Sequence, residues 1–414
     1  MKIKDIDPEL FNWYYKEWRR QEEGLELIPS ENYVPIEILQ ASGSILTNKY
    51  SEGYPAKRYY GGNEYVDEIE LLAINRAKKL FEVDHANVQP HSGSSANMAA
   101  YFALANFQDK IMGLNLQHGG HLTHGSAVNF SGKLYKFVSY GVHPETHLLD
   151  FEEIASIAEK EKPKIIVCGY TAYPRQIDFS KFIKIAQDCG AYLMVDMAHI
   201  AGLIAGGVHP SPSKHAHIIT STTHKTLRGP RGAFILSKKE YAQAVDKAVF
   251  PGLQGGPLEN QIMAKAICFY LAMQPSFKNY AAQIVKNAKF LAKVLLDLHF
   301  DLISGGTDTH LILIDLRSKG LTGKEAQEVL DRAAITTNKN TIPNDPQSPF
   351  ITSGLRIGTP ALTSRGMKEN EMEVVAHLID EALKNKTDQT KLKEIKEKVK
   401  KLTAQFPIYP NLLN

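Results

Sequence analysis

The chain has 414 residues, 43% of them hydrophobic and 22% charged; this excludes collagen-like and disordered chains and fits a globular protein of roughly two to three domains. Its formal charge is +3, but eight lysines against three acidic residues between positions 384 and 401 leave the rest close to neutral, so nucleic-acid binding is not expected. Three cysteines, none in a Cys-x-x-Cys pair, are too few for a disulfide framework, and we expect a reducing, cytoplasmic environment.

Two helices are predicted near the N-terminus. Residues 1–10 mix Lys, Asp and Glu without an apolar run, so no signal peptide is expected. Residues 8–23 have the apolar spacing of an amphipathic helix that ends near Gly24. Residues 68–81, rich in Leu, Ala, Ile and Lys, form the second predicted helix.

Short apolar runs then alternate with helical stretches. The runs predict strands at 165–168, 192–195, 218–220 and 233–236, with a helix over 179–188 between the first two. Strands separated in this way indicate crossover connections, and we predict a mostly parallel, buried sheet.

The stretch 191–208 is apolar enough to imitate a membrane span. It contains Asp196, His199 and three glycines, and an aspartate at the centre of a span costs about 2.5–3.5 kcal/mol. We therefore predict a buried strand followed by a loop, and no contact with a membrane.

The C-terminal part is predicted to form a smaller α+β unit. Its elements are one or two long helices over 260–298, a strand at 311–316, a helix over 323–334, a strand near 355–357 and a helix over 371–383. The basic segment 384–401 continues into an amphipathic helix, which we expect to pack on the body through Leu392, Ile395, Val399 and Leu402. A polybasic contact with RNA or a membrane is the alternative.

A lysine and an aspartate are candidates for cofactor chemistry. Lys225 lies between a β-branched strand and a turn broken by Gly and Pro, and Asp196 closes the preceding strand 29 residues earlier. Ligands bind at such strand ends in open α/β sheets. A lysine amine can form a Schiff base with pyridoxal phosphate while a carboxylate pairs with the protonated ring nitrogen. A structural ion pair between the two strands is the alternative.

Two glycine-containing turns are candidate phosphate sites. The segment 91–95, HSGSS, precedes a predicted helix over 96–105, and free N–H groups at a helix start bind phosphate. An ordinary serine N-cap would have the same sequence. The segment 250–257, FPGLQGGP, is the second candidate, with a simple turn as its alternative. Neither matches a Walker motif, so nucleotide hydrolysis is not expected.

Three further groups of polar residues stand out. His118, His121 and His124 recur every third residue, but glycines interrupt them and no Cys or carboxylate lies nearby, so we expect stacking on a flat ring and no metal site. Arg356 lies among apolar and glycine residues and would pair with a substrate carboxylate or with a buried Asp or Glu. Residues 48–62 place four tyrosines and one acid in a glycine-rich loop, which favours a functional role.

Together these segments resemble the serine hydroxymethyltransferases, pyridoxal-phosphate enzymes of the aspartate-aminotransferase fold type. The resemblance runs from about Leu25 to Arg365, in order and at the expected spacing. It is carried by nine segments: LIPSENYVP, NKYSEGYPAKRYYGGNEYVDEIE, VQPHSGSSAN, GGHLTHGSAVNFSG, MVDMAHIAGLIAGG, TTHKTLRGPRG, FPGLQGGP, NKNTIP and SGLRIGTPALTSRG.

The resemblance implies the type I fold of these enzymes. That fold is α/β, with a large domain built on a mostly parallel seven-stranded sheet flanked by helices, a smaller α+β C-terminal domain and an N-terminal helical arm. The implied boundaries are 1–80 for the arm and a segment packing on the partner subunit, 81–280 for the cofactor-binding domain and 281–414 for the small domain.

The resemblance also implies contacts with the cofactor. Lys225 would hold pyridoxal 5'-phosphate covalently as an aldimine, Asp196 would pair with its pyridine nitrogen, and His121 would stack on its ring. Within a homodimer or tetramer with shared sites, its phosphate and phenolic oxygen would contact Ser92, Gly93, Ser94, Thr171, His199 and, from the neighbouring subunit, Tyr50 and Gly256.

The implied substrates are L-serine and tetrahydrofolate, with glycine and 5,10-methylenetetrahydrofolate as products. Ser30 and Arg356 would grip the amino-acid carboxylate. Glu52 would be the acid/base near the hydroxymethyl group, with Tyr60 beside it, and His224 would influence reaction specificity. The folate would contact Leu116, Gly120, Leu122, Asn340, Ser348, Pro349 and Phe350.

The sequence departs from the family pattern at two positions. Thr171 stands where Ser is usual, and we expect its hydroxyl to keep the hydrogen bond with tighter packing. Ser95 replaces the commoner Gln or Ala beside the phosphate loop, so both residues could tune cofactor affinity. A folate-independent threonine or allo-threonine aldolase on the same fold, and a non-catalytic cofactor carrier, are the alternative functions.

Overall fold

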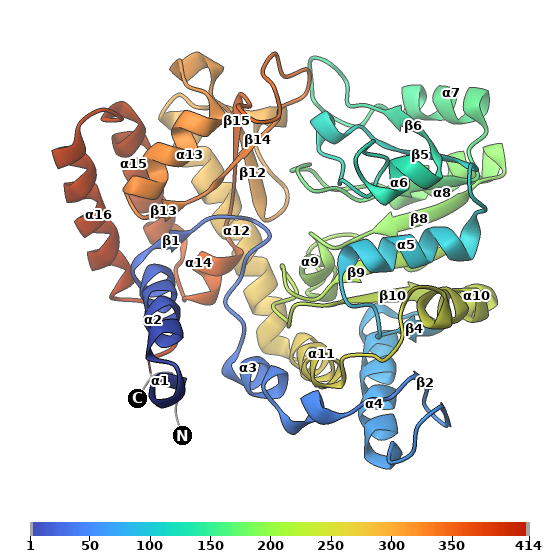
Figure 1. Ribbon diagram of the computed structural model, residues 1–414. Helices are drawn as coiled ribbons and strands as arrows, with labels where there is room; N and C mark the ends of the chain where they lie inside the picture. The colour runs from blue at the N-terminus through green and yellow to red at the C-terminus, as the bar shows by residue number, and fades with distance from the viewer. Residues whose placement is uncertain (1–2, 411–414) are drawn as a thin grey trace.

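A seven-stranded sheet forms the centre of the computed structural model, which describes residues 3–410 (Figure 1). Its strand order is β4-β10-β9-β8-β7-β5-β6. The strands are β4 (His85–Asn87), β5 (Lys110–Leu114), β6 (Lys136–Tyr140), β7 (Ile165–Cys168), β8 (Tyr192–Asp196), β9 (Ile218–Thr222) and β10 (Ala233–Ser237). Neighbours from β6 to β9 pair in parallel, which confirms the predicted mostly parallel, seven-stranded sheet.

Strand β10 is antiparallel to both β9 and β4. The prediction of crossover connections is therefore wrong for the link between β9 and β10, which is a loop that contains Lys225. Because an antiparallel neighbour needs only a short connection, this loop remains at the end of the sheet where β9 finishes.

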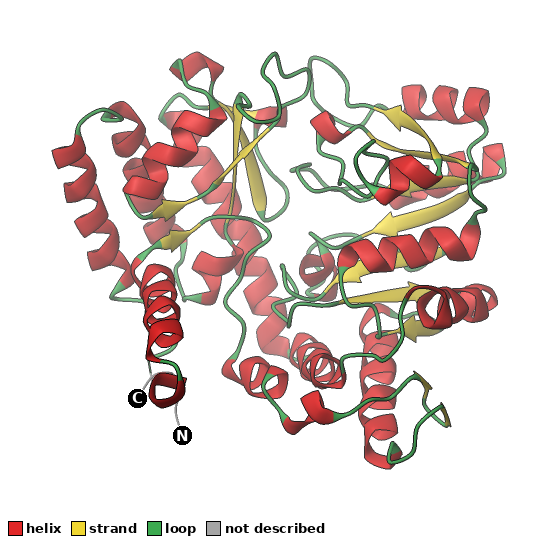
Figure 2. Ribbon diagram, in the orientation of Figure 1, coloured by secondary structure: helices red, strands yellow, loops and turns green. Residues whose placement is uncertain are grey.

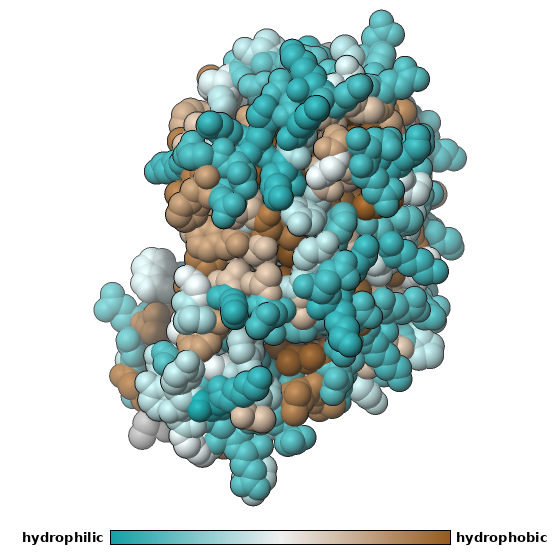
Figure 3. Space-filling model, turned by 90° about the vertical axis from the view of Figure 1, so that its right-hand side faces the viewer, coloured by the Kyte–Doolittle hydropathy of each residue, from teal (hydrophilic) through white to brown (hydrophobic). Residues whose placement is uncertain are grey.

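Helices cover both faces of this sheet (Figure 2). Alternate residues of a strand point to opposite faces, and in β7 Ile165 and Val167 pack with α5, α6 and α10, whereas Ile166 and Cys168 pack with α4, α7, α8 and α11. Every residue of β7 is therefore buried, as in parallel sheets covered on both sides. On the side where α7 and α10 lie, the outer surface is largely hydrophilic, with an apolar stretch across its middle (Figure 3).

The helices have the following bounds. They are α1 (Ile3–Ile6), α2 (Pro8–Glu23), α3 (Ile36–Ser42), α4 (Glu64–Phe81), α5 (Gly93–Leu104), α6 (Phe130–Leu134), α7 (Phe151–Glu161), α8 (Phe179–Cys189), α9 (Ala201–Ala205), α10 (Ala242–Lys247), α11 (Glu259–Ala272), α12 (Pro275–Asp297), α13 (Gly323–Arg332), α14 (Pro360–Ser364), α15 (Glu369–Lys384) and α16 (Gln389–Thr403).

A second, antiparallel sheet has the order β11-β12-β15-β14. Its strands are β11 (Asp301–Leu302), β12 (Leu311–Asp315), β14 (Asn338–Asn340) and β15 (Gly354–Gly358); the short pairs β1 (Leu25–Glu26) with β13 (Ile335–Thr336) and β2 (Gly53–Tyr54) with β3 (Lys57–Arg58) lie outside both sheets. A separate apolar core joins this sheet to α13, α15 and α16.

The predicted domain boundary at 280/281 falls inside α12, which contacts α9 beside the large sheet and α15 beside the small one. Leu25 and Leu27, in the predicted arm, belong to the core of the smaller unit. The three-part division of the chain stays a prediction.

Most predicted helices and strands are confirmed. Each was predicted from residues that are neighbours in sequence, so it does not depend on how the chain packs. Helix α2 begins after Asp7, whose side chain accepts from the Leu10 N–H at 2.9 Å, and ends at the predicted Gly24. Helix α16 buries the four predicted apolar residues. The predicted loop after β8 is wrong in one respect, since it contains the short helix α9. In the described part of the chain, no helix is both long and apolar enough to cross a membrane.

Candidate active site

A cavity of about 270 Å³ lies where β7, β8 and β9 end. The carboxyl ends of parallel strands meet at one sheet edge, so the loops after them supply side chains to the same space. The cavity is lined by Ser30, Ser92, Gly93, Ser94, Asn97, His121, His124, Tyr170, Thr171, Asp196, Ala198, His199, Thr222, His224, Lys225 and Arg231.

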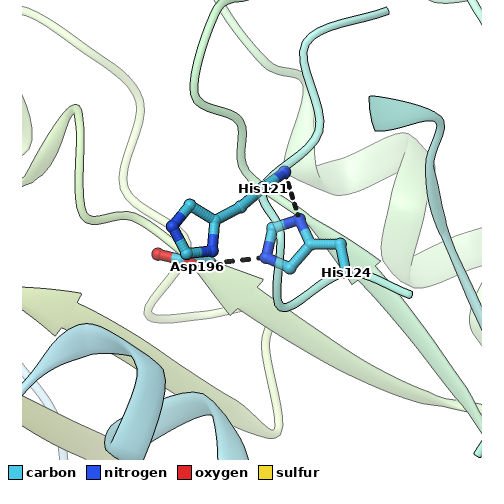
Figure 4. Close-up of side chains that lie close together, drawn as sticks. All are labelled: His121, His124 and Asp196. Carbon is cyan, nitrogen blue, oxygen red and sulfur yellow. Dashed lines mark hydrogen bonds and ion pairs between the residues drawn. The ribbon is translucent and has the colours of Figure 1, made fainter. Parts of the chain in front are cut away.

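Asp196, the last residue of β8, is held by three donors. The Asn97 side-chain amide donates to Oδ2 at 2.8 Å, and the Ala198 N–H donates to Oδ1 at 3.1 Å. The Nε2 atom of His124 lies 3.3 Å from Oδ2 (Figure 4). Burial raises the pKa of Asp196, but the hydrogen bonds from His124 and Asn97 outweigh it and hold this pKa well below its ordinary value. The cavity therefore contains a carboxylate that stays ionised.

The tautomer of His124 follows from its two contacts. Its Nδ1 atom accepts from the backbone N–H of His121 at 3.3 Å, so the ring proton lies on Nε2 and is donated to Asp196 (Figure 4). The expectation that no carboxylate lies near these histidines is wrong, since ligand atoms of His121, His124 and Asp196 lie within 4.8 Å of one another. Both nitrogens of His124 are already used, and His118 points elsewhere, accepting from the Val142 N–H.

Lys225 follows β9 by three residues and faces the same cavity as Asp196. Desolvation lowers the pKa of Lys225 to about 8; Asp196 opposes this shift, and Arg356 and Arg231 add to it. The backbone of Lys225 is fixed by the Asn32 side-chain amide, which donates to its carbonyl at 2.9 Å. The site thus places a partly neutral amine opposite a carboxylate.

The start of α5 forms another wall. Ser92 is the N-cap: its hydroxyl accepts from the Ser95 N–H at 3.3 Å, and its own N–H donates to the Ser95 hydroxyl at 3.0 Å. Ser95 therefore serves the capping box. A Cβ at Gly93 would lie 2.8 Å from a methyl carbon of Thr222, so only glycine allows this close approach to β9. The remaining N–H groups of the first turn, with Arg231 in the same wall, suit an anion.

Arg356 reaches toward the cavity from β15 of the second sheet. Its Nη1 donates to the Thr171 carbonyl at 2.7 Å and its Nε to the Asn338 side-chain carbonyl at 3.2 Å. Within residues 3–410 no Asp or Glu forms an ion pair with it, so the alternative of a buried acidic partner is wrong. Burial lowers the pKa of Arg356 to about 10.

A second cluster of predicted site residues lies outside this cavity. The Tyr50 hydroxyl donates to Oε1 of Glu52 at 3.1 Å, and the rings of Tyr50 and Tyr60 lie 5.1 Å apart. Gly256 packs against the Tyr50 ring. Tyr50 is 54% exposed and Tyr60 is 50% exposed. Within one chain, the structure does not bring these four residues to Lys225.

The residues predicted to contact folate also lie outside the cavity wall. Leu116, Leu122 and Phe350 are exposed, the last by 83%. His118 lies beside Asn344, so the loop after β5 meets the loop that precedes β15. The remaining members of the set are Gly120, Asn340, Ser348 and Pro349.

Sequence reasoning missed several residues of the cavity. Asn97 lies one turn after Gly93 on α5, a spacing that could have suggested a shared face. Arg231 belongs to the same TTHKTLRGPRG segment as Lys225. No local signal pointed to His310, which contacts His199 from the second sheet.

The chain matches a known protein family. A family model described as "SHMT: Serine hydroxymethyltransferase" matches residues 3–379, which is most of the chain.

Proposed function

The chain belongs to the serine hydroxymethyltransferase family of pyridoxal-phosphate-dependent enzymes, and we propose that it interconverts L-serine plus tetrahydrofolate with glycine plus 5,10-methylenetetrahydrofolate. The observation that carries the proposal is the shared cavity of Asp196 and Lys225, next to the N-terminus of α5.

The residues of the cavity fit pyridoxal phosphate. An ionised carboxylate suits a protonated pyridine nitrogen, a partly neutral lysine suits an aldehyde, and the first turn of α5 with Arg231 suits a phosphate. When bound, the cofactor supplies an electron sink for bond breaking at the amino-acid α-carbon. We propose that Lys225 is its covalent attachment point.

The other residues of the cavity would orient cofactor and substrate. His121 offers an imidazole face for stacking, and Thr171 and His199 would approach the phenolic oxygen. Ser30 lines the cavity, and Arg356 supplies a buried cation that has no carboxylate partner among residues 3–410. A substrate carboxylate would provide that partner and align the bond to be broken. His224, adjacent to Lys225, would tune reaction specificity.

Tyr50, Glu52, Tyr60 and Gly256 support a proposed homodimer with shared sites. They lie together, half-exposed and away from the chain's own Lys225. Their surroundings include further exposed apolar side chains, such as Tyr59 and Tyr65, each 75% exposed. A second copy would cover this surface, bring Tyr50 and Gly256 to the neighbouring phosphate, and place Glu52 to move a proton at the substrate hydroxyl.

Subunit complementation tests the shared site. Neither Lys225→Ala nor Tyr50→Ala homodimers should be active, but refolding the two together should restore part of the activity, because mixed dimers contain one complete site. Activity that stays absent in the mixture would contradict sharing.

The apolar side chains of Leu116, Leu122 and Phe350 are available to a pterin and its aromatic tail. Glycine formation from serine, measured with and without tetrahydrofolate, tests the function. We expect strong dependence on the folate; turnover that ignores it would favour the aldolase. The holoenzyme should show a visible Schiff-base band that Lys225→Ala abolishes and the exposed-lysine control Lys239→Ala retains.

A further inference from the structure

Two buried imidazoles meet behind the cavity. His199 lines the cavity and is 5% exposed, whereas His310 directly precedes β12 in the second sheet and is fully buried. Their rings lie 5.5 Å apart at an interplanar angle of 27°, and Nδ1 of His199 is 3.3 Å from Nε2 of His310. This imidazole–imidazole hydrogen bond joins the two units of the fold, as the bond from Arg356 to the Thr171 carbonyl also does.

Both rings are neutral. Burial, together with the charges of Lys225 and Arg356, lowers the pKa of His199 well below its ordinary value and that of His310 to about 3. Two neutral imidazoles share a single proton in their hydrogen bond, so one ring donates and the other accepts.

The surroundings of His310 decide which ring donates. Its Nδ1 atom is buried without a hydrogen-bond partner among the residues described. If His199 donated, His310 would carry its proton on Nδ1 and bury an N–H group with no acceptor. If His310 donates from Nε2, its Nδ1 keeps only an unused lone pair. A buried orphan N–H is the rarer and more costly arrangement.

The direction of this hydrogen bond determines which nitrogen of His199 carries the proton at the cavity. With Nδ1 of His199 accepting, the proton of that ring lies on Nε2. Nε2 of His199 makes no hydrogen bond within residues 3–410, and it is not among the fully buried polar atoms. It is therefore accessible from the cavity that the ring lines.

We propose that His310 is a positioning residue: it donates to His199 and thereby holds His199 as the Nε2–H tautomer, so that the cavity presents an N–H donor to an anionic oxygen of its ligand. Under the proposed function, on which the choice of ligand rests, that oxygen is the phenolic oxygen of pyridoxal phosphate. The backbones of both residues are fixed, since the Thr226 hydroxyl donates to the His199 carbonyl at 2.9 Å and the Thr359 N–H to the His310 carbonyl at 3.1 Å.

The first test reads the tautomer itself. Long-range ¹H–¹⁵N spectra of histidine-labelled protein, without and with pyridoxal phosphate, should show His199 protonated at Nε2. His310→Gln keeps an amide donor near the lost Nε2 and should preserve this tautomer, whereas His310→Phe should give a mixture. His209→Phe is the control, because His209 is also buried but donates to the Pro210 carbonyl. A His199 ring protonated at Nδ1 in the unaltered protein, or unchanged in His310→Phe, would overturn the proposal.

The second test compares pyridoxal phosphate with its 3-deoxy analogue, which lacks the phenolic oxygen. His310→Phe should weaken binding of the cofactor by roughly 2- to 12-fold, the range for one hydrogen bond, and leave binding of the analogue unchanged. Equal weakening of both would mean a purely structural role. The first test measures the tautomer without a ligand, so it decides the role of His310 even if the protein does not bind the cofactor. Failure to bind pyridoxal phosphate would refute the proposed function instead.

Discussion

Two buried arginines of the smaller unit should respond differently to the same substitution. Arg356 makes two hydrogen bonds and has no carboxylate partner among the residues described. Arg365 is as deeply buried, but it donates to five backbone carbonyls, those of Gln21, Glu22, Gly24, Thr403 and Phe406. If Arg356 is kept for a ligand, removing it should not destabilise the fold.

The magnitude follows from the pKa of Arg356, which burial lowers from 12.5 to about 10. The folded chain therefore binds this proton less tightly than the unfolded chain, a penalty of about 3 kcal/mol that applies in full below pH 10 and fades toward pH 12.5. Arg356→Met removes the penalty and loses two charge-assisted hydrogen bonds worth about 1.5 kcal/mol each. The free energy of unfolding should thus change by about 1 kcal/mol or less. Arg365→Met also removes a burial penalty, but it loses five such hydrogen bonds and should lower the free energy of unfolding by about 5 kcal/mol.

Urea unfolding of the two holoenzyme variants, followed by circular dichroism, measures both changes. In a second assay, L-serine at about a hundred times its Kd should stabilise the unaltered protein by about 2.7 kcal/mol. L-serinamide, which lacks the carboxylate, should not stabilise it, and Arg356→Met should respond to neither. An Arg356→Met protein that unfolds as easily as Arg365→Met, or that L-serine still stabilises, would refute the reasoning.

Three further predictions concern the cavity and the loop beside it. Because the neutral amine of Lys225 increases as pH rises toward its pKa of about 8, attachment of pyridoxal phosphate to the apo protein should accelerate about tenfold per pH unit below pH 8 and level off above it, followed by visible absorbance. Asn97→Ala removes a donor from Asp196 and should lower kcat about 10-fold or more. Arg58→Met leaves the carboxylate of Glu70, 2.6 Å away and buried, without its cation, and should lower the free energy of unfolding by about 3–5 kcal/mol.

Matched variants separate these effects from general damage. Asn106→Ala, just beyond α5, and Arg332→Met, on an exposed helix face, should leave kcat and the urea midpoint unchanged. A midpoint near pH 10.5 for cofactor attachment would contradict the lowered pKa of Lys225. An Asn97→Ala enzyme with unaltered kcat would show that the other two donors suffice for Asp196.

Much of the fold could be predicted from helix caps, terminal glycines and the spacing of apolar residues. The Asp7 cap, the terminal Gly24 and the apolar spacing of α2 depend only on neighbours in sequence, and the same holds for the β7 strand and for α16. Strand ends and glycine-rich turns in the sequence likewise pointed to Lys225, Asp196 and Ser92, because the ends of parallel strands meet at one edge whatever the details of packing.

The contacts between side chains of the site could be determined only from the tertiary structure. Only the packed chain shows that Asn97 and His124 both bind Asp196 and that Arg356 forms no ion pair with an acidic residue in the described part of the chain. It also shows that His310, directly before β12 of the second sheet, contacts His199. The antiparallel direction of β10 also has no local signal, because it depends on which edge of β9 accepts it. The hydrogen bond from Arg356 to Thr171 joins residues 185 positions apart in sequence; it depends on how the two units dock, and periodicity along the chain does not specify docking.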